Sequence, residues 1–166
     1  MNKKSFLTAS TLALAISTAT TAVYSAELEE IIVTAQKRAE SLQDVPISMS
    51  ALSGSTIKDN GIHSFQDLSG YVPNLEIAEN AVNTIITMRG IGIGSNQSFE
   101  QSVGIYVDGV HFGKSRQVRS GLFDVEQVEV LRGPQGILFG KNTLAGAINV
   151  ITASANVGDE FSGGID

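Results

Sequence analysis

Hydrophobic and small polar residues alternate in several short stretches of the chain, which is the pattern of half-buried β-strands. The first stretch is residues 45–52 (VPISMSAL), where Pro46 lies near the start and a strand tolerates its missing N–H. Glycine-rich turns separate further stretches of this kind. We therefore predict a strand at 45–52 and four more at residues 84–89, 103–108, 125–131 and 145–151.

Two short helices are predicted between the first and the second of these strands. Residues 55–60 are followed by Gly61, and glycine commonly ends a helix. Ser64 with Asp67 three residues later has the form of a capping box, and we expect the helix that it starts to end before Pro73. Because the helices cluster early instead of alternating with every strand, we expect an α+β fold with a small mixed β-sheet and short helices.

Residues 1–26 have the pattern of an export signal. Lys3 and Lys4 precede an apolar stretch that is diluted by Ser and Thr, and small residues follow at its end. The unbroken apolar centre, residues 12–16, is five residues long, whereas a bilayer-spanning helix needs roughly twenty. We therefore predict that residues 1–26 form a cleaved secretory signal peptide.

The composition excludes several classes of function. The chain has 166 residues, a formal net charge of −6 and no cysteine. Disulfide frameworks, thiolate metal sites and cysteine nucleophiles are therefore ruled out. A general nucleic-acid binder is not expected either, because phosphate binding needs clustered Lys and Arg.

Two glycine-rich stretches resemble nucleotide-binding loops only superficially. In RGIGIG (89–94), the position of the third glycine of a dinucleotide loop falls on Ser95. In GILFGKNT (136–143), Asn142 follows the lysine where a phosphate loop needs Ser or Thr to hold magnesium. We therefore predict no nucleotide cofactor.

The remaining candidates for catalysis or metal binding are also weak. Glu126 and Glu129, close to Asp124, lie three positions apart on a predicted strand and should face opposite ways, so a solvated surface is the better interpretation. His63 and His111 have no neighbours at metal-ligand spacing. We predict no catalytic residue, no metal site and no enzyme activity.

The segment 27–41 (ELEEIIVTAQKRAES) is a short run of β-branched residues between charged residues. Such residues favour extended backbone, whereas the flanking charges disfavour burial in the chain's own sheet. An extended segment of this kind can add itself to the sheet edge of another protein. The residues alone leave two alternatives open, which are this β-augmentation and an ordinary first strand of the domain.

Glycines and two arginines punctuate the predicted strands. The glycines are expected to provide turns with positive φ or close backbone approach: Gly90, Gly104, Gly109, Gly133, Gly136, Gly140 and Gly146. Arg89 and Arg132 each end a predicted strand and precede a glycine. On the residues alone, solvent-exposed arginines at turns are favoured over guanidinium groups aimed at carboxylates across an interface.

Several motifs together resemble the N-terminal plug domain of TonB-dependent outer-membrane receptors. They are, in order, EEIIVTAQKR, DVPISMSAL, MRGIG, VGIYVDGV and VEQVEVLRGPQGILFGKNTLAGAINVIT, and they extend from residue 27 to about residue 153. The resemblance implies a TonB-dependent receptor plug fold that fills the lumen of a large outer-membrane β-barrel. It divides the chain into a TonB-box segment and linker (27–44), the plug (45–153) and the start of a first barrel strand (154–166).

The resemblance also assigns roles to individual residues. The TonB box, which pairs as a strand with the C-terminal domain of TonB, corresponds to Glu30, Ile31, Ile32, Val33, Thr34 and Ala35. Arg89 and Arg132 match plug arginines that face acidic residues of the barrel wall. The loops 90–102 and 111–121 match loops that face the extracellular ligand, and the residues expected there are Ser95, Asn96, Gln97, Phe112 and Arg116.

The expected function is therefore that of a gate in an outer-membrane receptor, which engages TonB for the energy-coupled import of a scarce ligand such as a siderophore. Only 13 residues follow the plug, too few for a barrel, so we expect a truncated receptor, a gene fragment or an isolated plug that cannot transport alone. The alternative is a standalone periplasmic module that binds TonB or a small ligand.

Overall fold

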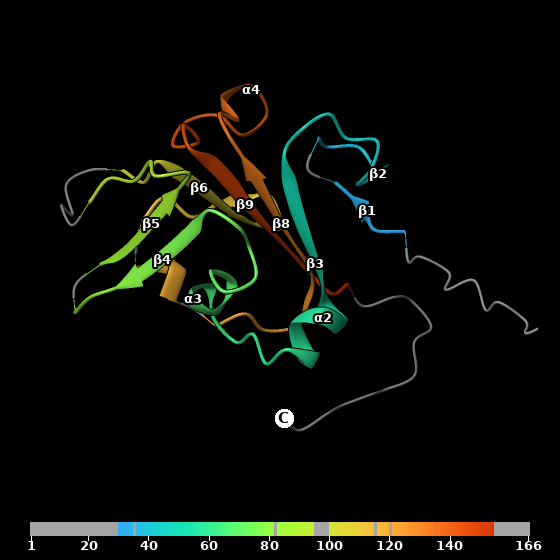
Figure 1. Ribbon diagram of the computed structural model, residues 1–166, viewed down its shortest axis with the longest axis horizontal. Helices are drawn as coiled ribbons and strands as arrows, with labels where there is room; N and C mark the ends of the chain where they lie inside the picture. The colour runs from blue at the N-terminus through green and yellow to red at the C-terminus, as the bar shows by residue number, and fades with distance from the viewer. Residues whose placement is uncertain are drawn as a thin grey trace, which may run out of the picture.

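A computed structural model describes residues 30–34, 36–81, 83–94, 100–114, 116–119 and 121–154. Within these residues the chain forms one five-stranded sheet, two separate two-stranded ladders and several short helices (Figure 1). No closed barrel occurs among these elements. The predicted α+β class with a small mixed sheet is confirmed.

The five-stranded sheet has the strand order β3-β8-β9-β6-β7. Neighbouring strands are antiparallel except for β6 and β9, which are parallel and make the sheet mixed. The strands are β3 (Met49–Ser53), β6 (Val103–Val107), β7 (Val110–His111), β8 (Val125–Arg132) and β9 (Gly146–Thr152).

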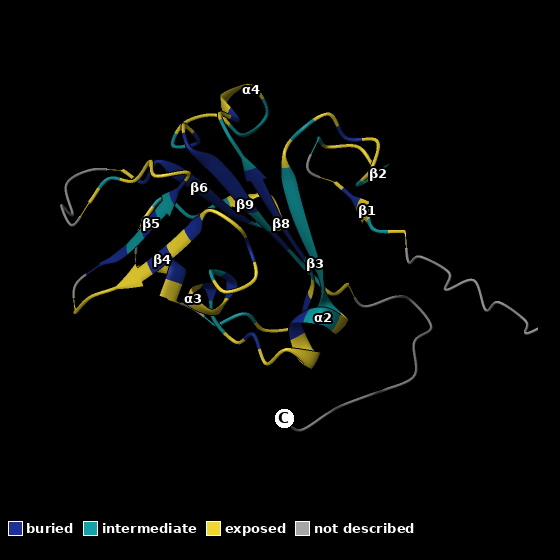
Figure 2. Cartoon of the chain, viewed as in Figure 1, coloured by how far each residue is buried: buried dark blue, intermediate teal, exposed yellow. Residues whose placement is uncertain are grey.

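One face of this sheet carries the main hydrophobic core. In the ladder between β8 and β9, Val128 lies opposite Val150 and Val130 opposite Ile148, and all four side chains are buried. The core is completed by the helices α2 (Gly54–Asp59) and α3 (Phe65–Leu68) and by the hairpin of β4 (Leu75–Glu79) and β5 (Thr84–Met88). Figure 2 shows that the inner strands β8 and β9 are largely buried.

The opposite face of the sheet carries a smaller cluster of Tyr106, Leu131 and Ala147, against which Met49 and Phe139 pack. Phe139 belongs to the short helix α4 (Gly136–Phe139), and its carbonyl accepts a hydrogen bond from the Tyr106 hydroxyl. Burial raises the pKa of Tyr106 above its ordinary value. Both faces of the sheet are therefore covered, but by different elements.

The predicted capping box at the start of α3 is present. The Ser64 hydroxyl accepts from the Asp67 N–H, and the Asp67 carboxylate accepts from the Ser64 N–H. The Ser64 hydroxyl and the His63 N–H also donate to this carboxylate, and these contacts hold the pKa of Asp67 below its ordinary value. Two of the backbone N–H groups that a helix start leaves free, those of Ser64 and Asp67, are thereby satisfied.

Three differences from the predicted elements have simple causes. β3 begins at Met49 instead of residue 45, four positions later, because the stretch around Pro46 is not paired with β8. β4 is not predicted from the sequence, because only two of its residues, Leu75 and Ile77, are buried and the alternation is too short to stand out. The strand is recognised by its pairing with β5. The short elements β7 and η1 (Gln117–Arg119) were not predicted either, since each has only two or three residues.

The glycines fall into three groups. A positive φ occurs at Gly90, Gly109, Gly133 and Gly140. Gly104 and Gly146 lie within strands, where a Cβ would come within 2.4 Å of Thr143 Cγ2 and within 2.3 Å of the Leu131 carbonyl oxygen, respectively. Gly136, the first residue of α4, has neither property, so the expectation of a special backbone role is wrong there.

Candidate functional site

The segment 30–34 contains one strand of a small antiparallel ladder that is separate from the five-stranded sheet (Figure 1). β1 (Ile32–Val33) pairs with β2 (Glu40–Ser41), and Lys37 has a φ of 60° in the turn between them. Val33 is 1% exposed, whereas Ile32 is 46% exposed. Of the six residues expected to form a TonB box, five lie in this described segment and Ala35 lies outside the described residues.

The backbone of β1 has one paired edge and one edge directed away from β2. The Leu42 N–H donates to the Ile31 carbonyl over 2.9 Å, so this pair is hydrogen-bonded. Because hydrogen-bonded and non-bonded pairs alternate in an antiparallel ladder, the next pair, Ile32 with Ser41, is not bonded across the ladder. The N–H and C=O of Ile32 therefore point to the outer edge of β1.

The same outer edge meets a buried carboxylate at Thr34. The Thr34 N–H donates to Glu129 Oε1 over 2.5 Å, and its hydroxyl approaches the same oxygen at 3.3 Å. Asn149 Nδ2 donates to Glu129 Oε2 over 2.9 Å, and Gln127 Nε2 lies 3.4 Å from Oε1. The Glu129 side chain is completely buried.

This burial corrects the expectation of a solvated surface at 124–129. Asp124 and Glu126 are exposed as expected, but Glu129 is buried on the face of the sheet where Thr34 of the N-terminal segment, residues 30–34, contacts it. A strand pattern tells which side chains share a face, but it does not tell which distant segment covers that face. The only sequence signal for Glu129 was its position between Val128 and Val130 in an otherwise apolar run.

A cavity of about 350 Å³ lies beside the contact between Thr34 and Glu129. Thr34 and Asn149 line it, together with Lys37 and Arg38 from the turn and Phe139 from α4. It is open to solvent and has both polar and apolar walls. Water therefore has access to the immediate surroundings of this contact.

The two candidate interface arginines differ in their contacts. Arg132 donates from Nη2 to the Met49 carbonyl over 3.0 Å, and its Nη1 lies 3.5 Å from the Pro73 carbonyl. Arg89 is exposed, and its Nη1 would lie 3.4 Å from a Cβ on Gly133, the residue after Arg132. Among the described residues neither arginine pairs with a carboxylate; the ion pairs there are Arg38–Glu40 and Lys141–Glu100.

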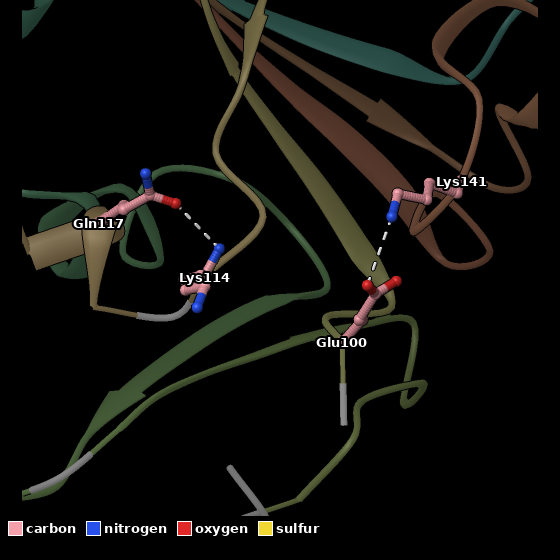
Figure 3. A network of polar contacts seen from close by, with 4 residues as sticks. All are labelled: Glu100, Lys114, Gln117 and Lys141. Atoms are coloured by element: carbon pink, nitrogen blue, oxygen red, sulfur yellow. Dashed lines mark hydrogen bonds and ion pairs between the residues drawn. The ribbon is translucent and has the colours of Figure 1, made fainter. Parts of the chain in front are cut away.

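Two contacts order the loops expected to face a ligand, and both are drawn in Figure 3. Lys141 Nζ lies 3.4 Å from Glu100 Oε1, which joins the loop before β6 to the loop after α4. The Lys114 N–H donates to Gln117 Oε1 over 3.0 Å within the second loop. The hydrogen bond from Lys141 is the main cause that lowers the pKa of Glu100.

The residues expected to meet the ligand are not brought together by the described structure. Phe112 is half-buried and packs against the main core, which does not favour ligand contact. Arg116 is exposed. Ser95, Asn96 and Gln97 lie outside the described residues.

Two negative observations apply to the described part of the chain. Its helices are all too short or too polar to cross a membrane. Its His, Asp and Glu side chains form no group of three or more that could hold a metal ion.

Comparison with known proteins gives the same family at the level of sequence and of structure. Residues 41–147 match the family described as the TonB-dependent receptor plug domain. The pesticin receptor of Yersinia pestis is 33% identical over 125 residues, which cover 74% of this chain and 18% of the receptor. The vitamin B12 transporter BtuB of Vibrio vulnificus is 30% identical over 131 residues, covering 76% of this chain and 21% of the transporter.

Solved structures agree with this result. The ferric yersiniabactin uptake receptor FyuA from Yersinia pestis superimposes with a TM-score of 0.59 and 36% identity, covering 65% of this chain and 17% of that one. The ferric-catecholate import receptor Fiu from E. coli K12 gives a TM-score of 0.54 and 30% identity, covering 70% and 16%. The chain thus spans about a fifth of the length of these relatives, and all of them are receptors or transporters, which favours the receptor hypothesis over a standalone module. The chain belongs to the TonB-dependent receptor plug domain family.

Proposed function

We propose that this chain is the plug of an outer-membrane uptake receptor, in which it gates the lumen of a β-barrel and engages TonB for import of a scarce ligand. The relatives named for yersiniabactin, catecholate and vitamin B12 support a siderophore-like or vitamin-like ligand. Export through a signal peptide at 1–26 and placement in the outer membrane are part of the same proposal.

The observation that carries the proposal is the outer edge of β1. In the described part of the chain, the two-residue strand β1 pairs only with β2 and lies outside the five-stranded sheet. Its second backbone edge therefore has no strand of the described residues beside it. Pairing of an extended peptide with the exposed edge of another sheet uses such backbone groups for affinity. The segment 30–35 is therefore suited to pair with a strand of the TonB C-terminal domain.

The two arginines fit the same proposal. Neither Arg89 nor Arg132 has a carboxylate partner among the described residues, and a guanidinium group without such a partner favours an acidic group opposite it. We assign these groups to the wall of the barrel. The loops at 90–102 and 111–121 are assigned to the ligand side, with Ser95, Asn96, Gln97 and Arg116 as the residues to test first.

The proposal is tested by replacing Ile32 with proline. The substitution removes an N–H that points away from β2, so it should leave the ladder with β2 in place and abolish pairing with TonB. Titration of the TonB C-terminal domain by calorimetry should show binding to the unchanged chain and at least a tenfold loss for Ile32→Pro, about 1.4 kcal/mol.

The matched control is Ile32→Thr, which keeps both the N–H and the β-branched side chain. This variant should bind within about threefold of the unchanged chain, roughly 0.6 kcal/mol. Equal affinities for the proline variant and the unchanged chain would exclude the segment as the TonB-binding strand.

A further inference from the structure

Glu129 is a buried carboxylate whose described partners are all neutral. Its four donors are the N–H and hydroxyl of Thr34 and the side-chain amides of Gln127 and Asn149. A charge in a dry site is costly unless each oxygen accepts hydrogen bonds. Two of the four donors come from the N-terminal segment, so the position of this segment and the solvation of Glu129 depend on each other.

The Thr34 N–H is also part of the outer edge of β1. Side chains and backbone groups repeat every two residues along a strand, so the N–H groups of Ile32 and Thr34 point to the same edge. A partner strand that pairs along this edge needs both groups. Glu129 occupies one of them in the described structure.

From this geometry we propose that Glu129 competes directly with the TonB strand for the Thr34 N–H and so controls how readily the N-terminal segment is released. The inference rests on the proposed function for the identity of the partner strand. Glu129 acts here as a positioning residue for the segment.

The surroundings of the contact allow it to open. When Thr34 leaves, Glu129 loses two donors, but the cavity of about 350 Å³ beside Thr34 and Asn149 is large enough for several water molecules. Water can then solvate the carboxylate, while Asn149 still donates to its second oxygen. The contact is therefore strong while the Glu129 side chain is buried, and water can replace it once the segment lifts away.

The contact is tested without TonB by amide hydrogen exchange, measured by NMR on the 15N-labelled chain. Glu129→Gln removes the charge, and Glu129→Asp keeps the charge but shortens the side chain by one bond, roughly 1.5 Å. In both variants the Thr34 amide should exchange about tenfold faster, because a hydrogen bond to a carboxylate is lost or weakened.

Two internal references distinguish local release from loss of the fold. The Ala145 amide, which donates to the Ser102 carbonyl in the body of the domain, should exchange at an unchanged rate. Glu126→Gln, an exposed position on the same strand, should change neither amide. If one Glu129 variant also raises the exchange rate of the Ala145 amide, its fold is disturbed and the other variant decides the test. An unchanged exchange rate of the Thr34 amide in a folded variant would show that Glu129 does not hold Thr34.

The competition is tested by titrating the TonB C-terminal domain into the same proteins. Both Glu129 variants keep residues 30–34 intact, and they should bind about tenfold more tightly than the unchanged chain because the competing acceptor is weaker in Glu129→Gln and farther away in Glu129→Asp. If the Thr34 amide exchanges faster in the variants but their affinity for the TonB C-terminal domain equals that of the unchanged chain, Glu129 does not compete with the TonB strand. If no form of the chain binds TonB, the proposed function fails, while the exchange result still decides whether Glu129 holds Thr34.

Discussion

At the scale of single residues, Arg132 shows that an arginine at the end of a strand can have a structural role within the plug itself. Its guanidinium contacts the carbonyls of Met49 and Pro73, which belong to β3 and to the segment before β4. Its Nε is buried without a partner in the described residues. The side chain therefore joins two separate parts of the plug, whether or not it also meets an acidic group of a barrel.

We predict that Arg132→Ala lowers the free energy of unfolding of the chain by roughly 1–2 kcal/mol, because hydrogen bonds from a charged group to backbone carbonyls are lost. Urea denaturation followed by circular dichroism measures this change. Arg89→Ala is the control; this exposed side chain should contribute less than about 0.5 kcal/mol. Equal losses for both variants would show that the carbonyl contacts of Arg132 do not stabilise the plug.

The glycines provide a second prediction at this scale, because the space around Gly146 in β9 is tightly filled, whereas the space around Gly136 at the start of α4 is open. A Cβ at Gly146 would lie 2.3 Å from both the Leu131 carbonyl oxygen and Met88 Sδ. Gly146→Ala should therefore cost about 2 kcal/mol or more, since backbone must move. A Cβ at Gly136 would have no atom within 4 Å, so Gly136→Ala should be neutral or stabilising by about 0.5 kcal/mol.

Thermal unfolding of both glycine variants compares these effects directly. The melting temperature should fall for Gly146→Ala and stay or rise for Gly136→Ala. A stable Gly146→Ala variant would mean that Leu131 of β8 and Met88 of β5 do not approach Gly146 as closely as described.

At the scale of elements, helix α3 has only four residues and depends on its capping box. Hydrogen bonds from Ser64 and His63 lower the pKa of Asp67, so the carboxylate form is favoured in the folded state. A carboxyl with a depressed folded pKa contributes stability above its unfolded pKa, near 4, and this contribution is lost as the pH falls through the folded value.

We predict that Asp67→Asn destabilises the chain by about 0.5–1 kcal/mol at pH 7, a modest value because the group is largely exposed to solvent. The difference between the variant and the unchanged chain should narrow below about pH 4, as Asp67 becomes protonated in the unchanged chain. Urea denaturation from pH 7 to pH 3 measures this. A constant difference over this range would contradict the role of the carboxylate.

At the scale of the whole molecule, the two faces of the five-stranded sheet have different coverings. The face with Val128 and Val130 packs against the helices and the β4–β5 hairpin to form the main core, in which no residue before Leu52 takes part. The other face packs against α4 and meets the N-terminal segment through Glu129. The N-terminal ladder is therefore expected to detach without loss of the core.

We predict that a chain that begins at residue 42 still unfolds cooperatively, with a stability lower by about 2 kcal/mol, the value of burying one valine such as Val33. Urea denaturation with an m-value close to that of the longer chain would confirm a retained core. Loss of the cooperative transition would show that the ladder of β1 and β2 is part of the folding unit.

Local features of the fold were predictable from the sequence because they depend on neighbouring residues. The strands β5, β6, β8 and β9 begin and end within one residue of their predicted bounds, since their apolar residues are consecutive or alternate clearly. The capping box needs only Ser64 and Asp67 at the correct spacing. β4 is not predicted because its hydrophobic alternation is short, and only its pairing with β5 in the structure identifies it as a strand.

The sequence by itself determined the class of the domain, its main strands and its family likeness, because periodicity and motifs are recorded in residues that are close along the chain. Only the tertiary structure decided that Glu129 is buried, that Thr34 contacts it across 95 positions, and that the outer edge of β1 meets this carboxylate. The physical reason is that an alternating pattern defines the two faces of a strand, whereas long-range packing decides what covers each face.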